Sequence, residues 1–288
     1  MKRILMYGAV AAAMAALWAP YRSVQAQERV VGESATAAVV SPHLPDGTPD
    51  LSGLWNGTAN GGGAGANQPS RDDRGNIYLG IGRGREGSLV NFERDSGVLQ
   101  RADPNRPQYK PQYWARVRWY DENGNTEDPE FLCFPAGVPR MGPPTKIVQT
   151  PGEFTFLYAQ RNTFRTIYMD GRPHPPEDQW EGRWYGHSVG RWEEGDTLVI
   201  DSVDFTDASW LGWPGWIHSD GMRVEERITR EGDMLRWQAT VHDPEMLLKP
   251  WTSNPVVRRL NLTPRAELPE ELPCSERDAK QIVTKERG

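Results

Sequence analysis

Ionisable residues in the second half of the chain have types and spacing suited to acid–base chemistry. Glu226 alternates with Val224 and Ile228 in an expected strand, so its carboxylate shares their apolar face. A carboxylate on such a face must be paired or kept neutral, because an isolated buried charge is very costly. Glu226 is therefore a candidate general base. The structural alternative is a salt bridge to an inward arginine, Arg165 or Arg191.

Two histidines accompany this carboxylate. Strand alternation puts His187 and Arg191 on the same face as Val189, so they point into the interior if Val189 does. His218 and Asp220 lie in the loop that leads into the next strand. Imidazole and carboxylate groups around a cavity are suited to moving protons, and an arginine there binds an anion or carbonyl. The predicted catalytic residues are Glu226, His187, His218 and Asp220.

Aromatic and polar loop residues are the predicted substrate contacts. The segment DASWLGWPGW carries Trp210, Trp213 and Trp216, whose flat side chains are suited to stacking on a sugar or an aromatic ring. The alternative is a lid that packs over the end of a barrel, and the two roles are compatible. A second turn-rich segment, DGRPHPPEDQ, follows a strand. The remaining predicted substrate-binding residues are Arg191, Tyr168, Arg172 and His174.

Other site chemistries fit the sequence less well. The histidines are tens of residues apart, whereas zinc ligands occur at short spacing, so no metal ligand is predicted and a metal ion is the minor alternative. The segment GHSVG at 186–190 lacks the Gly-x-Ser-x-Gly elbow of serine hydrolases. The glycines at 80–84 lack the strand and helix of a phosphate loop. No organic cofactor is expected.

The net charge excludes some partners, and the first residues of the chain indicate export. The formal net charge of −6 argues against a nucleic-acid partner. Lys2 and Arg3 precede an apolar run that ends in Val-Gln-Ala, which predicts a secretory signal peptide at 1–26. A membrane anchor is the alternative, but the run is too short to span a bilayer easily. We expect a periplasmic or secreted protein with no transmembrane span after cleavage.

The two cysteines, Cys133 and Cys274, are far apart in the sequence. In an exported protein such a pair predicts a disulfide bond. The alternative is a reactive thiol, although neither cysteine has a histidine near it in the sequence.

The pattern of strands predicts an all-β fold. A tether at 27–48 precedes a single domain at 49–288, which has a glycine-rich loop at 59–90. Expected strands at 146–150, 154–159 and 163–169 are followed by successive hairpins between 184 and 244. This order predicts an antiparallel β-barrel or strongly bent sheet with long loops. Gly53-Leu54-Trp55 resembles the Gly-x-Trp that opens the first strand of lipocalin-like (calycin) barrels.

Several motifs together resemble an uncharacterised family of secreted bacterial β-rich proteins. They include CFPAGVPRM, IYMDGRPHP, GHSVGRWEEGDTLVIDSVDF and HSDGMRVEER, and the resemblance covers residues 49–277. It implies an extracytoplasmic, β-rich protein and carries no catalytic role with it. The family's recurrent positions correspond to Asp170, Arg172, His174, Arg191, Trp192, Asp196, His218, Glu226 and Arg227.

Two functions remain open. The first is an exported, cofactor-independent lyase, hydratase or hydrolase that uses His and Glu on a small glycosidic or aromatic molecule in a barrel cavity. The second is a periplasmic binding or carrier protein in which the same residues only orient a small-molecule ligand. Buried ionisable groups cost stability, which favours the enzyme. The sequence makes no prediction about oligomeric state.

Overall fold

The computed structural model describes most of the chain after residue 40. The described residues are 41–56, 105–193, 196–212, 215–271 and 274, with the backbone alone at 70–71 and 77–78. All of them belong to one compact unit, Val39–Gly288. Several predicted features lie outside the described residues: the signal peptide at 1–26, the tether up to residue 40, the rest of the glycine-rich loop and Trp213.

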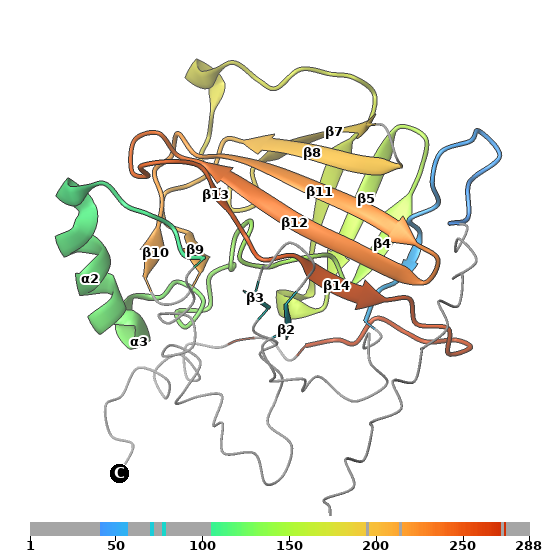
Figure 1. Ribbon diagram of the computed structural model, residues 1–288, viewed down its shortest axis with the longest axis horizontal. Coiled ribbons are helices and arrows are strands. Elements are labelled where there is room, and N and C mark those ends of the chain that lie inside the picture. Colours follow the sequence, from blue (N-terminus) through green and yellow to red (C-terminus); the bar gives the residue numbers. More distant parts are fainter. Residues whose placement is uncertain are drawn as a thin grey trace, which may run out of the picture. The chain divides into compact units, whose positions relative to one another are not determined.

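The fold is all-β, built on one strongly curled sheet of ten strands, as the sequence predicts (Figure 1). The strand order is β1-β4-β5-β6-β7-β8-β11-β12-β13, and β14 also pairs with β12. The strands are β1 (Gly53–Leu54), β4 (Lys146–Gln149), β5 (Glu153–Tyr158), β6 (Thr163–Tyr168), β7 (His187–Glu193), β8 (Thr197–Val203), β11 (Arg223–Glu231), β12 (Met234–His242), β13 (Trp251–Thr252) and β14 (Val256–Arg259).

Smaller elements complete the described structure. Two short hairpins are formed by β2 (Ser70–Arg71) with β3 (Ile77–Tyr78) and by β9 (Trp210–Gly212) with β10 (Trp216–Ile217). The helices are η1 (Pro111–Tyr113), α2 (Trp114–Glu122), α3 (Gly124–Glu127), η2 (Gln160–Asn162) and η3 (Glu177–Gln179). Helix α2 lies beside the β9–β10 hairpin (Figure 1). No helix in the described part of the chain is long and apolar enough to cross a membrane.

The curl brings the end of β14 next to the first strand. Just after β14, the backbone N–H of Asn261 donates to the carbonyl of Leu54 in β1, with an N–O distance of 2.7 Å. Gly53 has a φ of +141°, and a Cβ there would lie 2.4 Å from the side chain of Leu260. Glycine at this position therefore permits the close approach of the two chain segments. Hydrogen bonding here also shields an otherwise unpaired sheet edge.

The inner face of the curled sheet carries the core. Alternate residues of each strand point inward, and those of β5, β8, β11 and β12 are fully or nearly fully buried. Burying each large apolar side chain contributes about 1.5–3 kcal/mol to folding. The largest buried inner side chains on these strands include Phe154, Phe156, Leu198, Ile200, Ile228, Leu235 and Trp237. The interior is therefore filled by side chains from several strands.

The connection from β6 to β7 covers the outer face of β8 near its C-terminal end. Strands β6 and β7 are parallel, and every other pairing in the sheet is antiparallel. Parallel neighbours cannot be joined by a tight hairpin, so residues 169–186 form a long crossover. The crossover lies against the outer side of β8, where it contacts Asp201 and donates two backbone N–H groups to Asp204 just beyond the strand. Every residue of β8 is buried.

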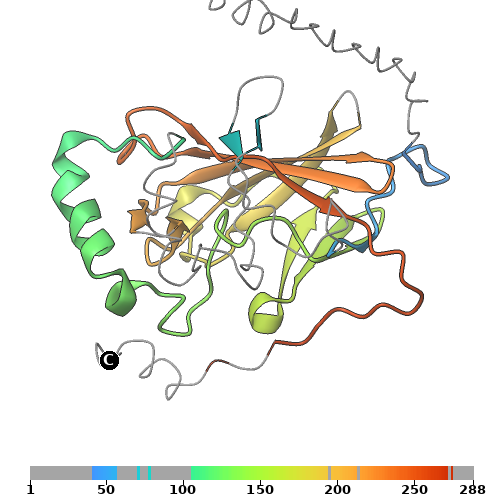
Figure 2. The same ribbon diagram turned by 60° about the horizontal axis from the view of Figure 1, so that its bottom comes forward.

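A disulfide between Cys133 and Cys274 confirms the predicted pairing, with a Cα–Cα distance of 5.5 Å. It joins the loop after α3 to the segment that follows β14, which leads away from the sheet in an extended path (Figure 2). Asn162 fastens the same segment, because its side chain exchanges two hydrogen bonds of 2.7 and 2.9 Å with the backbone of Glu271. The C-terminal segment is thus held at two neighbouring points.

Candidate functional site

Glu226 lies inside the sheet, paired with Arg165. The two side chains form an ion pair in which they are only 1% and 2% exposed. The indole N–H of Trp237 donates to the other carboxylate oxygen over 2.9 Å. The sequence alternative of a salt bridge to Arg165 is therefore confirmed. Because both charges are enclosed by core side chains, Glu226 has no open path to a substrate in this arrangement.

Arg165 links several strands through its guanidinium. Nε donates to Ser188 Oγ over 3.0 Å, and Nη2 donates to Ser202 Oγ over 2.9 Å. Burial tends to lower the pKa of Arg165, but the charge of Glu226 and the nearby Tyr158 outweigh it and raise the pKa, so the guanidinium stays charged. Burial also raises the pKa of the Tyr158 hydroxyl. This polar cluster holds strands together in the core.

His218 is a second buried polar group, satisfied by its own neighbours. It is 1% exposed, and its Nδ1 lies 2.8 Å from the carbonyl oxygen of Ser219. A carbonyl only accepts, so Nδ1 carries the proton and Nε2 accepts from the hydroxyl of Ser209 at 2.7 Å. Burial lowers the pKa of His218, which favours the neutral ring. Asp220 is exposed, and no hydrogen bond joins it to His218 within the described residues.

His187, Val189 and Arg191 lie on the outer face of β7, so the inward orientation that was expected if Val189 pointed inward is wrong. Ser188 is buried instead, because its hydroxyl binds Arg165 in the interior. Val189, the residue that the alternation argument relied on, is only partly buried. Arg191 has a 52% exposed side chain and pairs with Glu193 at 2.7 Å. The four predicted catalytic residues therefore do not form one group: Glu226 and His218 are in the core, and His187 is outside.

The outer position of His187 places it in a different cluster. The crossover brings His174 between His187 and Asp201 on β8. His174 Nδ1 lies 2.9 Å from His187 Nδ1, and His174 Nε2 lies 3.1 Å from Asp201 Oδ2. Arg223 on β11 holds the same carboxylate with two hydrogen bonds of 2.6 Å each. These contacts form an unbroken hydrogen-bonded row from Asp201 through His174 to His187.

The protonation states in this row follow from its partners. Burial alone would raise the pKa of Asp201, but hydrogen bonds from His174 and Arg223 lower it to about 2. The carboxylate is thus ionised and only accepts, so Nε2 of His174 carries a proton. When His174 is neutral, its Nδ1 accepts a hydrogen bond from the protonated Nδ1 of His187. The remaining nitrogen of His187, Nε2, is then an unprotonated base.

Electrostatics favour the neutral form of His187. Partial burial lowers its pKa, and the neighbouring His174, Arg183 and Arg172 lower it further. Among the described residues, only His174 is hydrogen-bonded to the His187 ring. His187 is partly exposed, unlike the two buried residues Glu226 and His218. Nε2 of His187 is therefore the basic nitrogen of this cluster that is left for an external molecule.

Other predicted substrate-binding residues surround His187. The Tyr168 ring lies 5.4 Å from the His187 ring, measured between centroids. The Arg172 guanidinium lies 3.8 Å from the Tyr168 centroid and pairs with Asp170. The structure therefore brings together Tyr168, Arg172, His174 and His187. The sequence analysis did not select Asp201, although a lone acid among the otherwise uncharged residues of β8 was an available signal.

The predicted aromatic loop is largely packed against the protein. Trp210 is 3% exposed and makes an edge contact with Tyr120 of α2, at 5.4 Å between centroids. Trp216 makes a similar contact with Trp251 at 5.5 Å. These contacts favour the packing role for Trp210 and Trp216, while Trp213 lies outside the described residues.

Within the part of the chain that the structure describes, no group of three or more His, Cys, Asp or Glu residues is arranged to hold a metal ion. No protein-family model, curated protein or solved structure matches this chain. The candidate site is therefore defined by its own geometry: the row Asp201–His174–His187 on the outer face of the sheet.

Proposed function

We propose that this protein is an exported enzyme that uses His187 for acid–base chemistry without an organic cofactor. The observation that carries the proposal is the hydrogen-bonded row from Asp201 through His174 to His187. A base oriented by a second group, which is itself oriented by a carboxylate, is a recurrent arrangement in catalysis. The disulfide and the predicted signal peptide support export.

The row supports a simple sequence of proton transfers. Nε2 of His187 takes a proton from water or from an acidic substrate group, and the proton on its Nδ1 moves to Nδ1 of His174. The resulting His174 cation faces the Asp201 carboxylate, which stabilises the charge. The reverse transfers return the proton to a leaving group. This chemistry serves a hydrolase, a hydratase or a lyase, and such catalysis contributes about 10²–10⁴-fold to rate.

The surroundings favour a small, polar substrate with a ring. The Tyr168 ring next to His187, with Arg172 over its ring at 3.8 Å from the centroid, forms an aromatic and planar polar surface suited to a sugar or an aromatic group. Each nearby arginine already has an acidic partner: Arg172 pairs with Asp170, and Arg223 with Asp201. The cluster therefore has no strong excess of positive charge. A glycosidic or aromatic molecule with little charge fits this environment better than a multiply charged anion.

The test is a screen of the purified protein against glycosides and plant phenolics, with products detected by mass spectrometry. For a substrate found in this way, His187→Gln should lower kcat by about 100-fold or more with a small change in KM. Asp201→Asn should lower kcat less and shift the pH profile, because it removes the charge that stabilises protonated His174. His43→Gln, which changes a histidine paired with Asp196, is the matched control.

Three outcomes separate the alternatives. Full turnover by His187→Gln would show that this histidine is not the base. Binding of a screened compound without product formation by the wild-type protein would instead support the carrier function. Turnover that is lost on adding a chelator and restored by a divalent metal would point to metal-assisted chemistry.

A further inference from the structure

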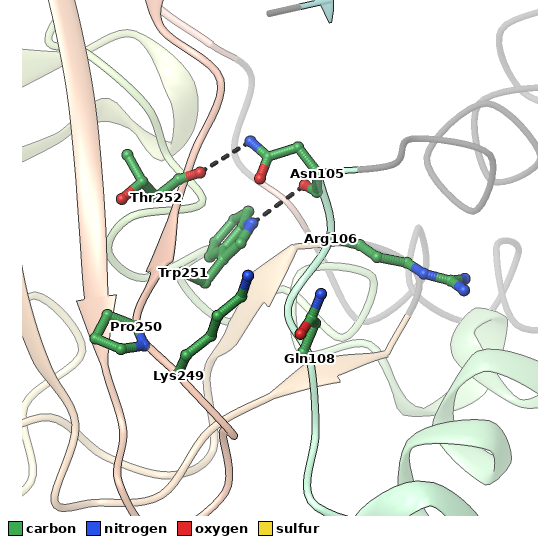
Figure 3. Close-up of a pocket in the computed structure, with 7 residues that line it drawn as sticks. All are labelled: Asn105, Arg106, Gln108, Lys249, Pro250, Trp251 and Thr252. Carbon is green, nitrogen blue, oxygen red and sulfur yellow. Dashed lines mark hydrogen bonds between the residues drawn. The ribbon is translucent and has the colours of Figure 1, made fainter.

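A hollow of about 280 Å³ lies between two chain segments that are far apart in the sequence (Figure 3). One segment precedes η1 and the other contains β13. They share no residue with the His187 cluster. The lining residues are Asn105, Arg106, Gln108, Lys249, Pro250, Trp251 and Thr252.

Hydrogen bonds at both ends of the hollow hold the two segments at a fixed distance from each other. On one side, the indole N–H of Trp251 donates to the carbonyl of Asn105 over 3.1 Å, and the Asn105 side chain donates to the carbonyl of Thr252 over 2.9 Å. On the other side, the backbone N–H of Leu248 donates to the carbonyl of Gln108 over 2.8 Å. The hollow is therefore framed by bonded chain at each end.

Two prolines explain why the two segments are not joined by backbone hydrogen bonds between these ends. Pro107 lies within the first segment and Pro250 within the second. Proline has no backbone N–H, so neither position can donate a hydrogen bond across the gap. The separation of the two segments is thus encoded by the sequence.

The lining is positively charged. Among the lining residues that the structure describes, none is acidic, and Arg106 and Lys249 are basic. The Lys249 ammonium lies between the two segments (Figure 3). It makes no hydrogen bond or ion pair with any residue that the structure describes. An ammonium in a concave polar site attracts anions, and the field inside a cleft strengthens this attraction.

We propose that this hollow binds a small molecule that carries a carboxylate. The Lys249 ammonium pairs with the carboxylate, the Gln108 side-chain amide donates a hydrogen bond, and the Trp251 ring forms a wall against the body of the ligand. The volume of about 280 Å³ is just below the usual range for ligand sites, about 300–1,000 Å³, so it suits a small molecule with one ring. A sugar acid and an aromatic acid share this chemistry.

The experiment is calorimetric titration of the full protein with D-glucuronate and with benzoate. D-glucose and benzamide are the uncharged analogues. We expect at least one carboxylate to bind tenfold or more tightly than its uncharged analogue, and the stronger of the two identifies the sugar or the aromatic source. Raising the salt concentration from 0.05 to 1 M should weaken this binding, because Lys249 is exposed.

Variants locate the binding. Lys249→Met keeps the length of the side chain and removes its charge, and it should weaken carboxylate binding about tenfold or more. Lys146→Met makes the same change on β4, outside the hollow, and should leave binding unchanged. Gln108→Trp changes an exposed side chain and should fill the hollow and abolish binding.

The proposal is overturned if neither carboxylate binds better than its uncharged analogue, or if Lys249→Met and Lys146→Met bind equally well. Because the hollow and the His187 cluster have no residue in common, His187→Gln should bind the carboxylate normally. A failure of either proposal therefore leaves the other standing.

Discussion

Replacement of Glu226 by Gln tests whether the buried ion pair holds the core together. Both partners of the pair are almost fully enclosed, with exposures of 1% for Glu226 and 2% for Arg165, so water cannot replace the lost partner. Removing one partner of a buried pair typically costs about 3–5 kcal/mol, because an unpaired charge stays buried. Glutamine keeps the shape and an acceptor for Trp237, so the loss is mainly electrostatic.

The assay is urea unfolding followed by tryptophan fluorescence. With a slope of about 3 kcal/mol per M, a loss of about 4 kcal/mol moves the midpoint down by about 1.3 M. Glu225→Gln is the matched control, because Glu225 directly precedes Glu226 in β11 and faces outward with 35% exposure. Its surface ion pairs contribute about 0–1 kcal/mol, so the midpoint should move little.

A double-mutant cycle identifies the source of the loss. Arg165→Met together with Glu226→Gln removes both charges, so it should cost several kcal/mol less than the sum of the two single changes. If Glu226→Gln destabilises no more than Glu225→Gln, the ion pair is not a determinant of stability. Additive single changes would equally contradict the reasoning.

Three further changes test other parts of the structure. Replacing both Cys133 and Cys274 by Ser opens a loop of 141 residues. The chain-entropy model predicts that the free energy of unfolding, measured in urea, falls by up to about 5 kcal/mol. Stabilisation by the disulfide is refuted if dithiothreitol leaves the wild-type midpoint unchanged. Asp201 has its pKa lowered from 3.8 to about 2 in the folded protein, so its contribution of about 2 kcal/mol to stability is present above pH 4 and is lost as the pH falls towards 2. Asp201→Asn should therefore make the urea midpoint less dependent on pH over this range, and an unaltered pH dependence would contradict the reasoning. Ser209→Ala leaves Nε2 of His218 unpaired and should cost about 1–3 kcal/mol while activity is retained, whereas a loss of activity at normal stability would show a catalytic role.

Much of the fold is predictable from local patterns. Alternation in MRVEERI places Val224, Glu226 and Ile228 on one face, and the structure buries all three. The prediction succeeds because β11 and β12 are neighbouring strands joined by a tight turn, so the buried positions follow directly from the two-residue alternation of the sequence. The parallel pairing of β6 with β7 was not predicted, since a long crossover and an irregular loop look alike in sequence.

The site was harder to predict because a strand can bury either face. On β7, Val189 indicated one face and the structure buries the other, since Ser188 completes the hydrogen bonds of Arg165. A buried cation must be satisfied, and this requirement outweighs a single valine. His187 was consequently placed in the wrong group, although it was identified as a candidate.

The sequence by itself determined the residue types, the disulfide partners and the strand periods, because these depend on composition and on neighbours along the chain. It also placed a carboxylate at an inward position of β11. Only the tertiary structure decided which arginine pairs with Glu226 and which acid is hydrogen-bonded to His174. The physical reason is that these partners are brought together by strand order and by the crossover, over separations of 61 and 27 residues. Local periodicity carries no information about such distant pairings.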